Sequence, residues 1–444
     1  MMKTRFIIGM FFTVLLFLIS ACNSVESKNS PADSASAIIK KRAQIEKCPD
    51  WKSGHTVKIT KNTRLDATCS YQQVSFSIEK ENIIFDCQGA SLNGLKQQQP
   101  NALFVAYSES SAPRSWAFSV WKSGVKIKNC HIKNYLDGIV IRTRISKQQH
   151  QMLRQKKKVN LIESQLRANS PHNIIISNTL IENSHKHGLY VQRYAHHIHL
   201  IKSKIKFSGN SAIYLDSGTQ YNLIKNSYFY KNGYSSYKNK KRIRTPKLPT
   251  AEREAIAVDS SAYNSFIGNT FENNGKGAIF LYKNCFEKHQ EPNQLPRFQY
   301  SNYNKIKNNR FINERYGVWL ASRQSKELSH FKCGDPLMYK ENGLFGNRKY
   351  YYDYAKNNQV INNTFKNVMF GIVVEDNNNQ LISNSFSGSS SLDILIGTAY
   401  RAKINKQIVK GILLKKNQRQ GTALKLNYRY GSKPMPLSIN QNSL

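Results

Sequence analysis

Two histidines and an arginine lie close together in a stretch that could move a proton beside a carboxylate. His185 and His187 belong to the run Asn183-Ser-His-Lys-His-Gly188, and Arg193 follows the next strand-like segment. Histidine carries protons near neutral pH, and arginine is a permanent cation that pairs with carboxylates. Abstracting a proton next to a carboxylate requires a base and a cation that stabilises the enolate-like charge. The alternative is a histidine-rich turn without a catalytic role.

Asp216 and Asp259 form a second candidate set, because each ends a short run of alternating apolar residues. In stacked parallel strands the two carboxylates would lie ~5 Å apart. At that distance each carboxylate raises the pKa of the other, which suits a general acid paired with a base or nucleophile, as in a retaining glycosidase. In the alternative, Arg193, Arg253 or a loop lysine neutralises the two carboxylates and the pair is structural.

The same strand-like runs direct aromatic and cationic residues outward. Their alternation leaves one outward column rich in aromatic residues and a second that carries the carboxylates. Aromatic rings in a row suit stacking against sugar rings, and they equally suit packing beneath an inserted loop. The predicted substrate-binding residues are Arg142, Tyr190, Tyr214, Tyr282, Lys283 and Trp319.

All these candidates except Arg142 belong to a stretch, residues 171–397, that repeats itself. In each unit a small polar residue precedes a large apolar residue by two places, and most units then reach a Gly or Ala that opens an alternating strand. The bare period is 21 to 25 residues, and longer gaps indicate coils with inserted loops. The pairs are Asn178/Leu180, Ser203/Ile205, Ser227/Phe229, Asn269/Phe271, Asn309/Phe311, Asn363/Phe365 and Asn384/Phe386.

A repeat of this period, with alternation of two inside each unit, predicts a solenoid of strands. One coil cannot bury its apolar residues alone, but coils stacked at ~4.8 Å form a continuous apolar column. Asn residues at the same place in each coil can form a ladder of side-chain amides. We therefore predict an all-β fold, a parallel β-helix over residues 48–400, with the right hand expected from related folds. Residues 401–444 are expected to form a basic coil or tail.

Four insertions interrupt the regular part, at residues 142–167, 233–250, 283–303 and 323–357. The first two are strongly basic, and the last three contain several aromatic residues. Insertions in a solenoid cluster as loops on one face, which is often the binding face. We expect the substrate to bind there.

The first 22 residues resemble a bacterial lipoprotein signal, with a basic start, a short apolar core and the run Ile19-Ser-Ala-Cys22. The resemblance implies removal of residues 1–21 and lipidation of Cys22, with residues 22–47 as a tether that can include a short capping helix. Asn follows Cys22 where an Asp would favour the inner membrane, so an outer-membrane anchor in the cell envelope is expected. A plain secretory signal is the alternative.

Lipidation of Cys22 would leave six cysteines. An even number in an exported chain predicts disulfides, although six cysteines allow ~15 pairings. No CxxC or Cys/His spacing indicates a metal site, and we expect no cofactor. The sequential pairing is Cys48–Cys69, Cys87–Cys130 and Cys285–Cys333.

The chain carries 66 Lys and Arg against 27 Asp and Glu, a formal net charge of +39. Such a charge concerns partners rather than fold and suits a polyanion, although lysine-rich solvated coil faces would give the same count. An exported lipoprotein rarely meets nucleic acid. The expected partners are therefore an acidic polysaccharide and, through the lipid, a membrane, and a monomer is expected.

The runs His187-Gly-Leu-Tyr-Val-Gln-Arg193, Ala212-Ile-Tyr-Leu-Asp216 and Ala255-Ile-Ala-Val-Asp259 resemble the coils of periplasmic mannuronan C5-epimerases and related right-handed β-helix carbohydrate enzymes. The resemblance covers roughly residues 183–282 and implies that Arg193 neutralises a substrate carboxylate. The Asp-Pro-His-Asp motif that supplies the epimerase base is absent. Lyase, hydrolase and binding-only roles therefore stay open on this scaffold.

Three functions are compatible with these residues. The leading one is an enzyme that acts on acidic polysaccharide by β-elimination or epimerisation, with His185, His187 or a groove tyrosine as the base. The second is a glycosidase that uses Asp216 and Asp259. The third is a non-enzymatic envelope protein that binds an acidic glycan or lipopolysaccharide through its basic loops.

Overall fold

The computed structural model describes residues 48, 51, 53–95, 113–238, 241–244, 253–324, 326–328, 331–335, 339–343, 346–398, 402, 408–430 and 433–434. The chain divides into two compact units, Met1–Cys48 and Pro49–Leu444, and the second unit contains almost all of the described residues. The expected signal peptide, the lipidated Cys22, the tether and the capping helix all lie outside the described residues.

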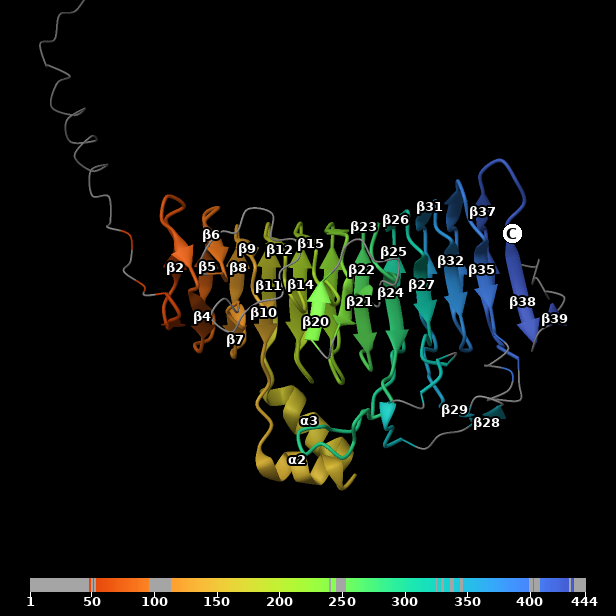
Figure 1. Cartoon of the computed structure of the whole chain (residues 1–444), viewed down its shortest axis with the longest axis horizontal. Coiled ribbons are helices and arrows are strands. Elements are labelled where there is room, and N and C mark those ends of the chain that lie inside the picture. The colour runs from red at the N-terminus through yellow and green to blue at the C-terminus, as the bar shows by residue number, and fades with distance from the viewer. Residues whose placement is uncertain are drawn as a thin grey trace, which may run out of the picture. The chain divides into compact units, whose positions relative to one another are not determined.

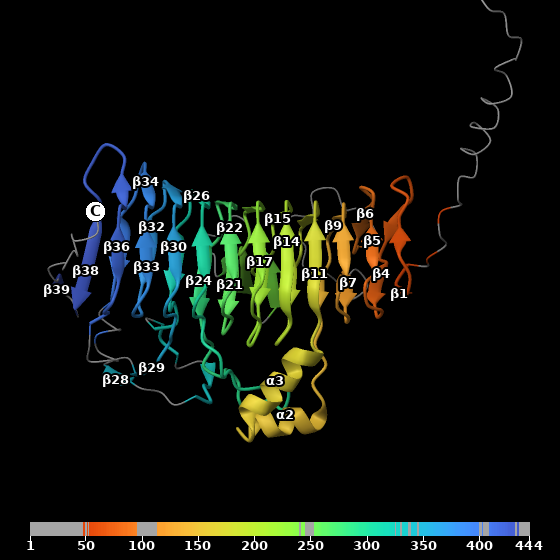
Figure 2. The ribbon, with the colours of Figure 1, turned by 180° about the vertical axis from the view of Figure 1, so that it is seen from behind.

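The second unit is a parallel β-helix whose chain passes through three sheets once per coil (Figures 1 and 2). All strand pairs of the three sheets are parallel except the last pair of sheet 1, β38 and β39. Sheet 1 consists of β1 (Thr56–Ile59), β4 (Ser75–Ile78), β7 (Trp116–Val120), β10 (Asp137–Ile141), β13 (Leu189–Val191), β16 (Ile213–Leu215), β21 (Glu254–Asp259), β24 (Gly277–Tyr282), β27 (Tyr316–Leu320), β32 (Phe370–Val374), β35 (Leu392–Ile396), β38 (Leu426–Tyr430) and β39 (Lys433–Pro434).

Sheets 2 and 3 supply the other two sides of each coil. Sheet 2 consists of β2 (Thr63–Arg64), β5 (Ile84–Asp86), β8 (Lys126–Lys128), β11 (His172–Ser177), β14 (His196–Ile201), β17 (Leu223–Lys225), β22 (Ser265–Ile267), β25 (Lys305–Lys307), β30 (Gln359–Ile361), β33 (Gln380–Ile382) and β36 (Leu413–Lys415). Sheet 3 consists of β3 (Tyr71–Gln72), β6 (Ser91–Asn93), β9 (His131–Lys133), β12 (Leu180–Glu182), β15 (Lys204–Lys206), β18 (Tyr228–Tyr230), β23 (Thr270–Glu272), β26 (Arg310–Ile312), β31 (Thr364–Lys366), β34 (Ser385–Ser387) and β37 (Gln418–Arg419).

The core runs along the inside of the coils, as the alternation predicts. Residues predicted to point inward from sheet 1 pair in register and are buried: Leu189, Ile213, Ile256, Ile279, Val318 and Ile372. In sheet 3 the rings of Phe229, Phe271, Phe311, Phe365 and Phe386 stack with centroids 4.7 to 5.1 Å apart. Stacked aromatic pairs add ~0.5–1.5 kcal/mol each to the area that they bury.

The first repeat unit is offset by one residue from the prediction. Ile181, and not Leu180, pairs with Ile205 and points inward, while Leu180 pairs with Lys204 and is half-buried. Thr179 takes the place predicted for Asn178, since its N–H donates to Ser203 Oγ at 3.2 Å. Successive Asn, Thr, Leu and Ile residues satisfy the pattern in either register, and only the packing of neighbouring coils decides between them.

The predicted ladder of polar side chains is confirmed. The backbone N–H of each rung donates to the side-chain oxygen of the next, from Ser203 through Ser227, Asn269, Asn309 and Asn363 to Asn384. Two further ladders, which the sequence analysis did not identify, occupy the other corners. They contain Asn222, Asn264, Asn304, Asn358 and Asn379 in one case and Asn232, Asn274 and Glu314 in the other.

Three of the four insertions follow strands of sheet 1 and precede strands of sheet 2, so they leave the coils at the same edge. The first folds into α2 (Lys147–Arg154) and α3 (Val159–Asn169), and the last contains the hairpin of β28 (Tyr339–Gly343) and β29 (Gly346–Tyr350). Figures 1 and 2 place these helices and this hairpin on the same side of the coils. The remaining insertion follows sheet 3 and contains the hairpin of β19 (Ser235–Lys238) and β20 (Lys241–Arg244).

Disulfides and the C-terminal coil complete the unit. The predicted Cys87–Cys130 and Cys285–Cys333 bonds are present, and Cys48 and Cys69 are also disulfide-bonded. The coils continue past residue 400 through β36, β37 and β38. Among the described residues, no helix has both the length and the apolar character that crossing a membrane requires.

Candidate active site

The outward columns of sheet 1 are formed as predicted, but they are largely covered. Tyr190 pairs with Tyr214, and Phe280 pairs with Trp319. Tyr190, Tyr214 and Trp319 are half-buried, whereas Tyr282 is only 2% exposed. The tyrosine and tryptophan rings pack with one another in an aromatic cluster on the outside of the sheet. This arrangement fits packing beneath inserted segments better than an open groove lined by exposed rings.

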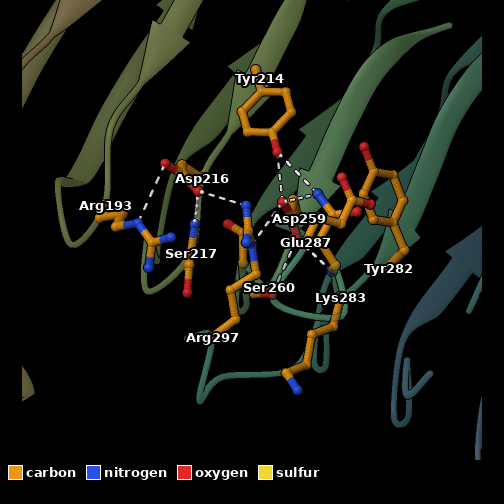
Figure 3. A network of polar contacts seen from close by, with 12 residues as sticks. Arg193, Tyr214, Asp216, Ser217, Asp259, Ser260, Tyr282, Lys283, Glu287 and Arg297 are labelled. Atoms are coloured by element: carbon orange, nitrogen blue, oxygen red, sulfur yellow. Dashed lines mark hydrogen bonds and ion pairs between the residues drawn. The ribbon is translucent and has the colours of Figure 1, made fainter. Parts of the chain in front are cut away.

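Asp216 and Asp259 do lie on neighbouring coils, but a cation from an insertion stands between them (Figure 3). Arg297, in the insertion after β24, places Nε 3.0 Å from Asp259 Oδ2 and Nη2 3.8 Å from Asp216 Oδ1. The hydroxyl of Tyr214 donates to Asp259 at 2.5 Å, and that of Tyr190 donates to Asp216 at 3.1 Å. The structure therefore neutralises this carboxylate pair, as in the structural alternative, through an arginine that was not among the predicted residues.

The electrostatics of Asp259 do not suit a general acid. Complete burial acts to raise its pKa, but Arg297 and the hydrogen bond from Tyr214 outweigh burial and lower the pKa below its ordinary value. Its other oxygen accepts the backbone N–H of Asn284 at 2.9 Å. Asp259 is thus an ionised carboxylate without a proton to donate and without exposed surface.

Arg193 is occupied in holding the same insertion. Its two terminal nitrogens donate to the backbone oxygens of Leu295 and Pro296 at 3.0 and 3.1 Å, and its Nε lies 3.8 Å from Asp216. Arg193 therefore anchors the loop that carries Arg297. Its role as neutraliser of a substrate carboxylate stays a prediction.

The predicted histidines and Arg142 each contact other residues of the coils. His187 Nδ1 lies 2.9 Å from Asp137 Oδ1, and its ring packs against Tyr190 and Tyr214. His185 is half-buried and its backbone N–H donates to Tyr135. Arg142 directly follows β10, where it donates to Ser119 and lies over the rings of Trp116 and Trp121. β10 pairs with β13, which carries Tyr190, whereas four strand pairs separate β10 from β24, which carries Tyr282.

A different set of charged residues meets on the outer face of sheet 1, around Tyr282. We define the basic cluster as Arg253, Lys276, Arg323 and Lys326. Arg253 and Lys276 directly precede the paired strands β21 and β24, and the backbone N–H of Lys276 donates to Arg253. Arg323 and Lys326 follow β27. Together with Glu254, Phe280, Tyr282 and Ser322 they line a cavity of about 20 Å³, room for one small group.

Positive charge in the basic cluster exceeds the negative charge around it. Four cationic side chains face two carboxylates, Glu254 and Glu287, which leaves an excess of two positive charges. Tyr282 donates to Glu254 at 2.7 Å, and Arg323 Nη2 lies 3.3 Å from Glu287. Arg323 is 3% exposed, and within the described part of the chain its Nε and Nη1 have no hydrogen-bond acceptor. Buried donors of this kind indicate a site that an anion or water would complete.

Burial and the surrounding positive charges change the pKa of one lysine of the cluster, Lys326. Burial, followed by the charges of Arg323, Lys276 and Arg253, lowers the pKa of Lys326 to about 7. The pKa of Lys276 is lowered as well, mainly by burial. A substantial fraction of Lys326 is therefore a neutral amine near neutral pH, and it can accept a proton.

Aromatic rings hold these cations in place. The guanidinium of Arg323 lies 4.8 Å from the ring centre of Tyr282, and Lys326 Nζ lies 4.8 Å from that of Phe331. Lys276 Nζ lies 5.9 Å from the ring centre of Trp319. Each contact is worth ~0.5–2 kcal/mol, which lets like charges stay close together without full hydration.

The described residues contain no group of three or more His, Cys, Asp or Glu side chains that could hold a metal ion. The candidate residues described above carry amine, guanidinium, imidazole, phenol and carboxylate groups. Of these, only the basic cluster combines an amine that titrates near neutrality with cations that have unused donors.

Comparisons with known proteins bear on the fold. Residues 116–334 match the family described as "Right handed beta helix region". This chain is a right-handed parallel β-helix. The predicted fold and hand are thereby confirmed. No curated protein sequence matches the chain.

Three solved structures illustrate the similarity. ORF18 of Geobacillus virus E2 has 10% identity and a TM-score of 0.40, with 89% of this chain and 65% of that chain covered. An α-1,3-glucanase catalytic unit from Streptomyces thermodiastaticus has 9% identity and a TM-score of 0.40, with 86% of this chain and 66% of that chain covered. An endo-xylogalacturonan hydrolase from Aspergillus tubingensis has 9% identity and a TM-score of 0.43, with 88% of this chain and 90% of that chain covered. This β-helix thus spans about two thirds of the first two proteins, and likenesses this low assign it no substrate or reaction.

Sequence reasoning missed Arg297 and the basic cluster. The positions of Arg297, Arg323 and Lys326 depend on where inserted loops fold back, and nothing local distinguishes these three residues among 66 Lys and Arg residues. One signal was available: Arg253 and Lys276 stand immediately before the Glu254 and Gly277 that open two successive strands. Residues at equivalent positions of adjacent coils lie ~5 Å apart, so two cations there predict an anion site.

Proposed function

We propose that this β-helix acts on an acidic polysaccharide by taking a proton from the carbon next to a uronate carboxylate. One observation carries the proposal: the basic cluster places Lys326, an amine that titrates near neutral pH, beside buried cations with unused donors. Proton abstraction next to a carboxylate requires this combination.

The steps can be written with the residues of the cluster. Arg323, with Arg253, pairs with the uronate carboxylate, which removes the negative charge that would oppose loss of the neighbouring proton. Neutral Lys326 takes the proton from C5, and the electron pair of the C–H bond forms the C4–C5 double bond as the C4–O bond breaks. The leaving oxygen takes a proton from Tyr282 or from water. In epimerisation the C4–O bond stays intact, Lys326 keeps the abstracted proton, and C5 receives a different proton from Tyr282 or from water on the opposite face.

Tyr282 suits the donor role because it keeps its proton. Burial, then the charge of Glu254, raises the pKa of Tyr282 well above its ordinary value. Its hydroxyl donates to Glu254 and lies in the same small cavity as Lys326. A neutral phenol beside a partly neutral amine supplies the acid and the base of an elimination.

The alternatives receive less support. For a histidine base, His187 is paired with Asp137 and Arg193 is engaged with the loop backbone. For a glycosidase, Asp259 has a lowered pKa and no exposed surface. Non-enzymatic binding of an acidic glycan remains the second candidate, because the excess charge of the cluster and the net charge of +39 favour it equally.

Localisation at the cell envelope is part of the proposal. Lipid on Cys22 would hold the protein at a membrane, where surface polysaccharides are within its reach. Metabolic labelling with a fatty acid tests this, because the label should attach to the wild type and not to Cys22→Ala.

The activity is tested with a panel of acidic polysaccharides and the purified, delipidated protein, by following the ultraviolet absorbance of the unsaturated uronate. We expect absorbance to rise with the wild type, and to stay flat with Lys326→Met although the glycan still binds. Lys305→Met, which removes an exposed lysine on the outer face of sheet 2, is the matched control and should act like the wild type. A flat trace with tight, salt-sensitive binding would favour the binding protein, with epimerisation left to a hydrogen-exchange assay at C5.

A further inference from the structure

A second cavity opens where the insertions converge, at the edge between sheets 1 and 2. Its volume is about 330 Å³, within the range of small-ligand sites. The insertions after β24 and after β27 form its walls, together with Lys156, an exposed residue just after α2. We call it the aromatic pocket, and its lining residues are Lys156, Lys283, Pro296, Arg297, Phe298, Tyr300, Asp335, Tyr351, Tyr352 and Tyr354.

Aromatic rings dominate the walls and fix one another. Tyr300 meets Tyr354 edge to face at 4.8 Å, and Tyr352 stacks with Tyr354 at 5.5 Å. Tyr352 and Tyr354 are half-buried, so each keeps accessible surface. Rigid rings that carry hydroxyl groups suit a ligand with an apolar face and a polar edge, which is the character of a pyranose ring.

The charges inside the pocket are paired, and the exposed Lys156 adds one positive charge at its edge. Lys283 Nζ lies 2.7 Å from Asp335 Oδ2, with the ring centres of Tyr300 and Tyr351 5.3 and 5.8 Å away. Arg297 is balanced by the carboxylate pair, Asp216 and Asp259. The interior thus offers donors and acceptors together, whereas the basic cluster has an excess of positive charge. A neutral sugar fits this interior better than a uronate, whose carboxylate would approach Asp335.

The aromatic pocket and the basic cluster share a wall. Tyr282 lines the cluster and the next residue, Lys283, lines the pocket, and their side chains diverge (Figure 3). The buried carboxylate of Asp353 accepts the backbone N–H of Lys283 on one oxygen and that of Arg323 on the other, both at 2.8 Å. These bonds fix the positions of the two cavities relative to each other.

We infer that the aromatic pocket is a subsite for a neutral pyranose residue of the glycan whose uronate carboxylate binds at the basic cluster. The inference rests on the proposed function and narrows its substrate class. The substrate would be a heteropolysaccharide that carries neutral sugars near its uronates, and a polymer of uronate alone would leave the pocket empty.

The test compares two probes by isothermal titration with the full-length mature protein. One probe is an oligosaccharide of uronate only, and the other has the same length and alternates uronate with neutral hexose. We expect the wild type to bind the mixed probe about tenfold more tightly, as one added aromatic subsite would give. Tyr352→Ala should lose this preference without changing its affinity for the uronate probe. Tyr352→Phe, which keeps the ring, should retain most of the preference.

The matched control is Tyr303→Ala, which removes an exposed tyrosine outside the pocket and should bind both probes like the wild type. A methyl hexoside should compete with the mixed probe on the unmodified protein, which tests the pocket even if Tyr352→Ala fails to fold. Equal affinity of the wild type for both probes, or no competition, would overturn the subsite while leaving the proposed function intact. If the wild type binds neither probe nor any acidic polysaccharide of the panel, the proposed function itself fails.

Discussion

Replacing Arg297 with Met should destabilise the β-helix strongly, because the carboxylates of Asp216 and Asp259 then lose the cation between them. Arg297 lies 3.0 Å from Asp259 and 3.8 Å from Asp216, and Asp259 has no exposed surface. At an effective dielectric constant of ~20, the shorter contact alone is worth ~5 kcal/mol before desolvation is subtracted. Removing one partner of a buried ion pair costs ~3–5 kcal/mol. Tyr214 and Asn284 still donate to Asp259, so we expect a loss near ~3 kcal/mol in the free energy of unfolding.

The loss should depend on pH in a defined direction. In the wild type the pKa of Asp259 is lowered, so its contribution to stability is full above the ordinary carboxylate range and disappears as the pH falls through the folded pKa. Without Arg297 the largest of the effects that lower the pKa of Asp259 is lost, so burial raises this pKa against the remaining hydrogen bonds from Tyr214 and Asn284. The gap between wild type and Arg297→Met should therefore be largest at neutral pH and should shrink in acid.

Urea unfolding followed by circular dichroism measures both effects. Adding Asp259→Asn to Arg297→Met should restore ~1–2 kcal/mol, because it removes the buried charge that lost its partner. Arg310→Met, on the exposed face of sheet 3, is the control and should change little. If Arg297→Met costs less than ~1 kcal/mol at neutral pH, or if Asp259→Asn does not rescue it, the carboxylate pair is not held as we describe.

Two further predictions concern the core and the ladders. Phe311→Ala should cost ~3–5 kcal/mol in urea unfolding, because its buried ring stacks with Phe271 and Phe365; a cost as small as that of the exposed Arg310→Ala would refute the stack. The wild type should lose stability as the pH rises, because of Glu314, and Glu314→Gln should not show this loss. Thermal unfolding at acidic and alkaline pH measures the difference. Burial raises the pKa of Glu314 well above its ordinary value, so the proton that the folded state keeps is lost by the unfolded chain as the pH rises through the ordinary range. Parallel pH profiles for wild type and Glu314→Gln would contradict this.

The coil repeat made the fold predictable, because it appears in the sequence itself. A period of 21 to 25 residues and an alternation of two leave few ways to bury the stacked phenylalanines and isoleucines. Even so, the register of the first unit was wrong by one residue at Leu180 and Ile181, where both residues are apolar and the local pattern fits two registers. The two corner ladders of Asn residues were not predicted, because the repeat pattern singles out one polar position per unit and leaves the other corners unassigned.

The site was predictable only in part. Tyr214, Asp216, Asp259 and Tyr282 come from the regular strands, and they lie on neighbouring coils as the alternation predicts. The residues that decide their chemistry come from insertions, whose backbone has no repeat. Arg297 reaches the carboxylate pair because the loop after β24 folds back, held by Arg193 and by Arg154 of α2. Long-range loop packing of this kind leaves no periodic signal in the sequence.

The most direct test of the proposed chemistry is the pH dependence of kcat/KM on the acidic polysaccharide that gives the largest rise in absorbance. If Lys326 takes the proton, kcat/KM should rise with pH as its amine deprotonates, with an acid limb centred at about 7 in the wild type. Lys326→Arg keeps the positive charge and cannot deprotonate in this range, so it should still bind the glycan but should lose both turnover and the limb. A Lys326→Arg protein with wild-type turnover and an unchanged acid limb would contradict the assignment of Lys326 as the base.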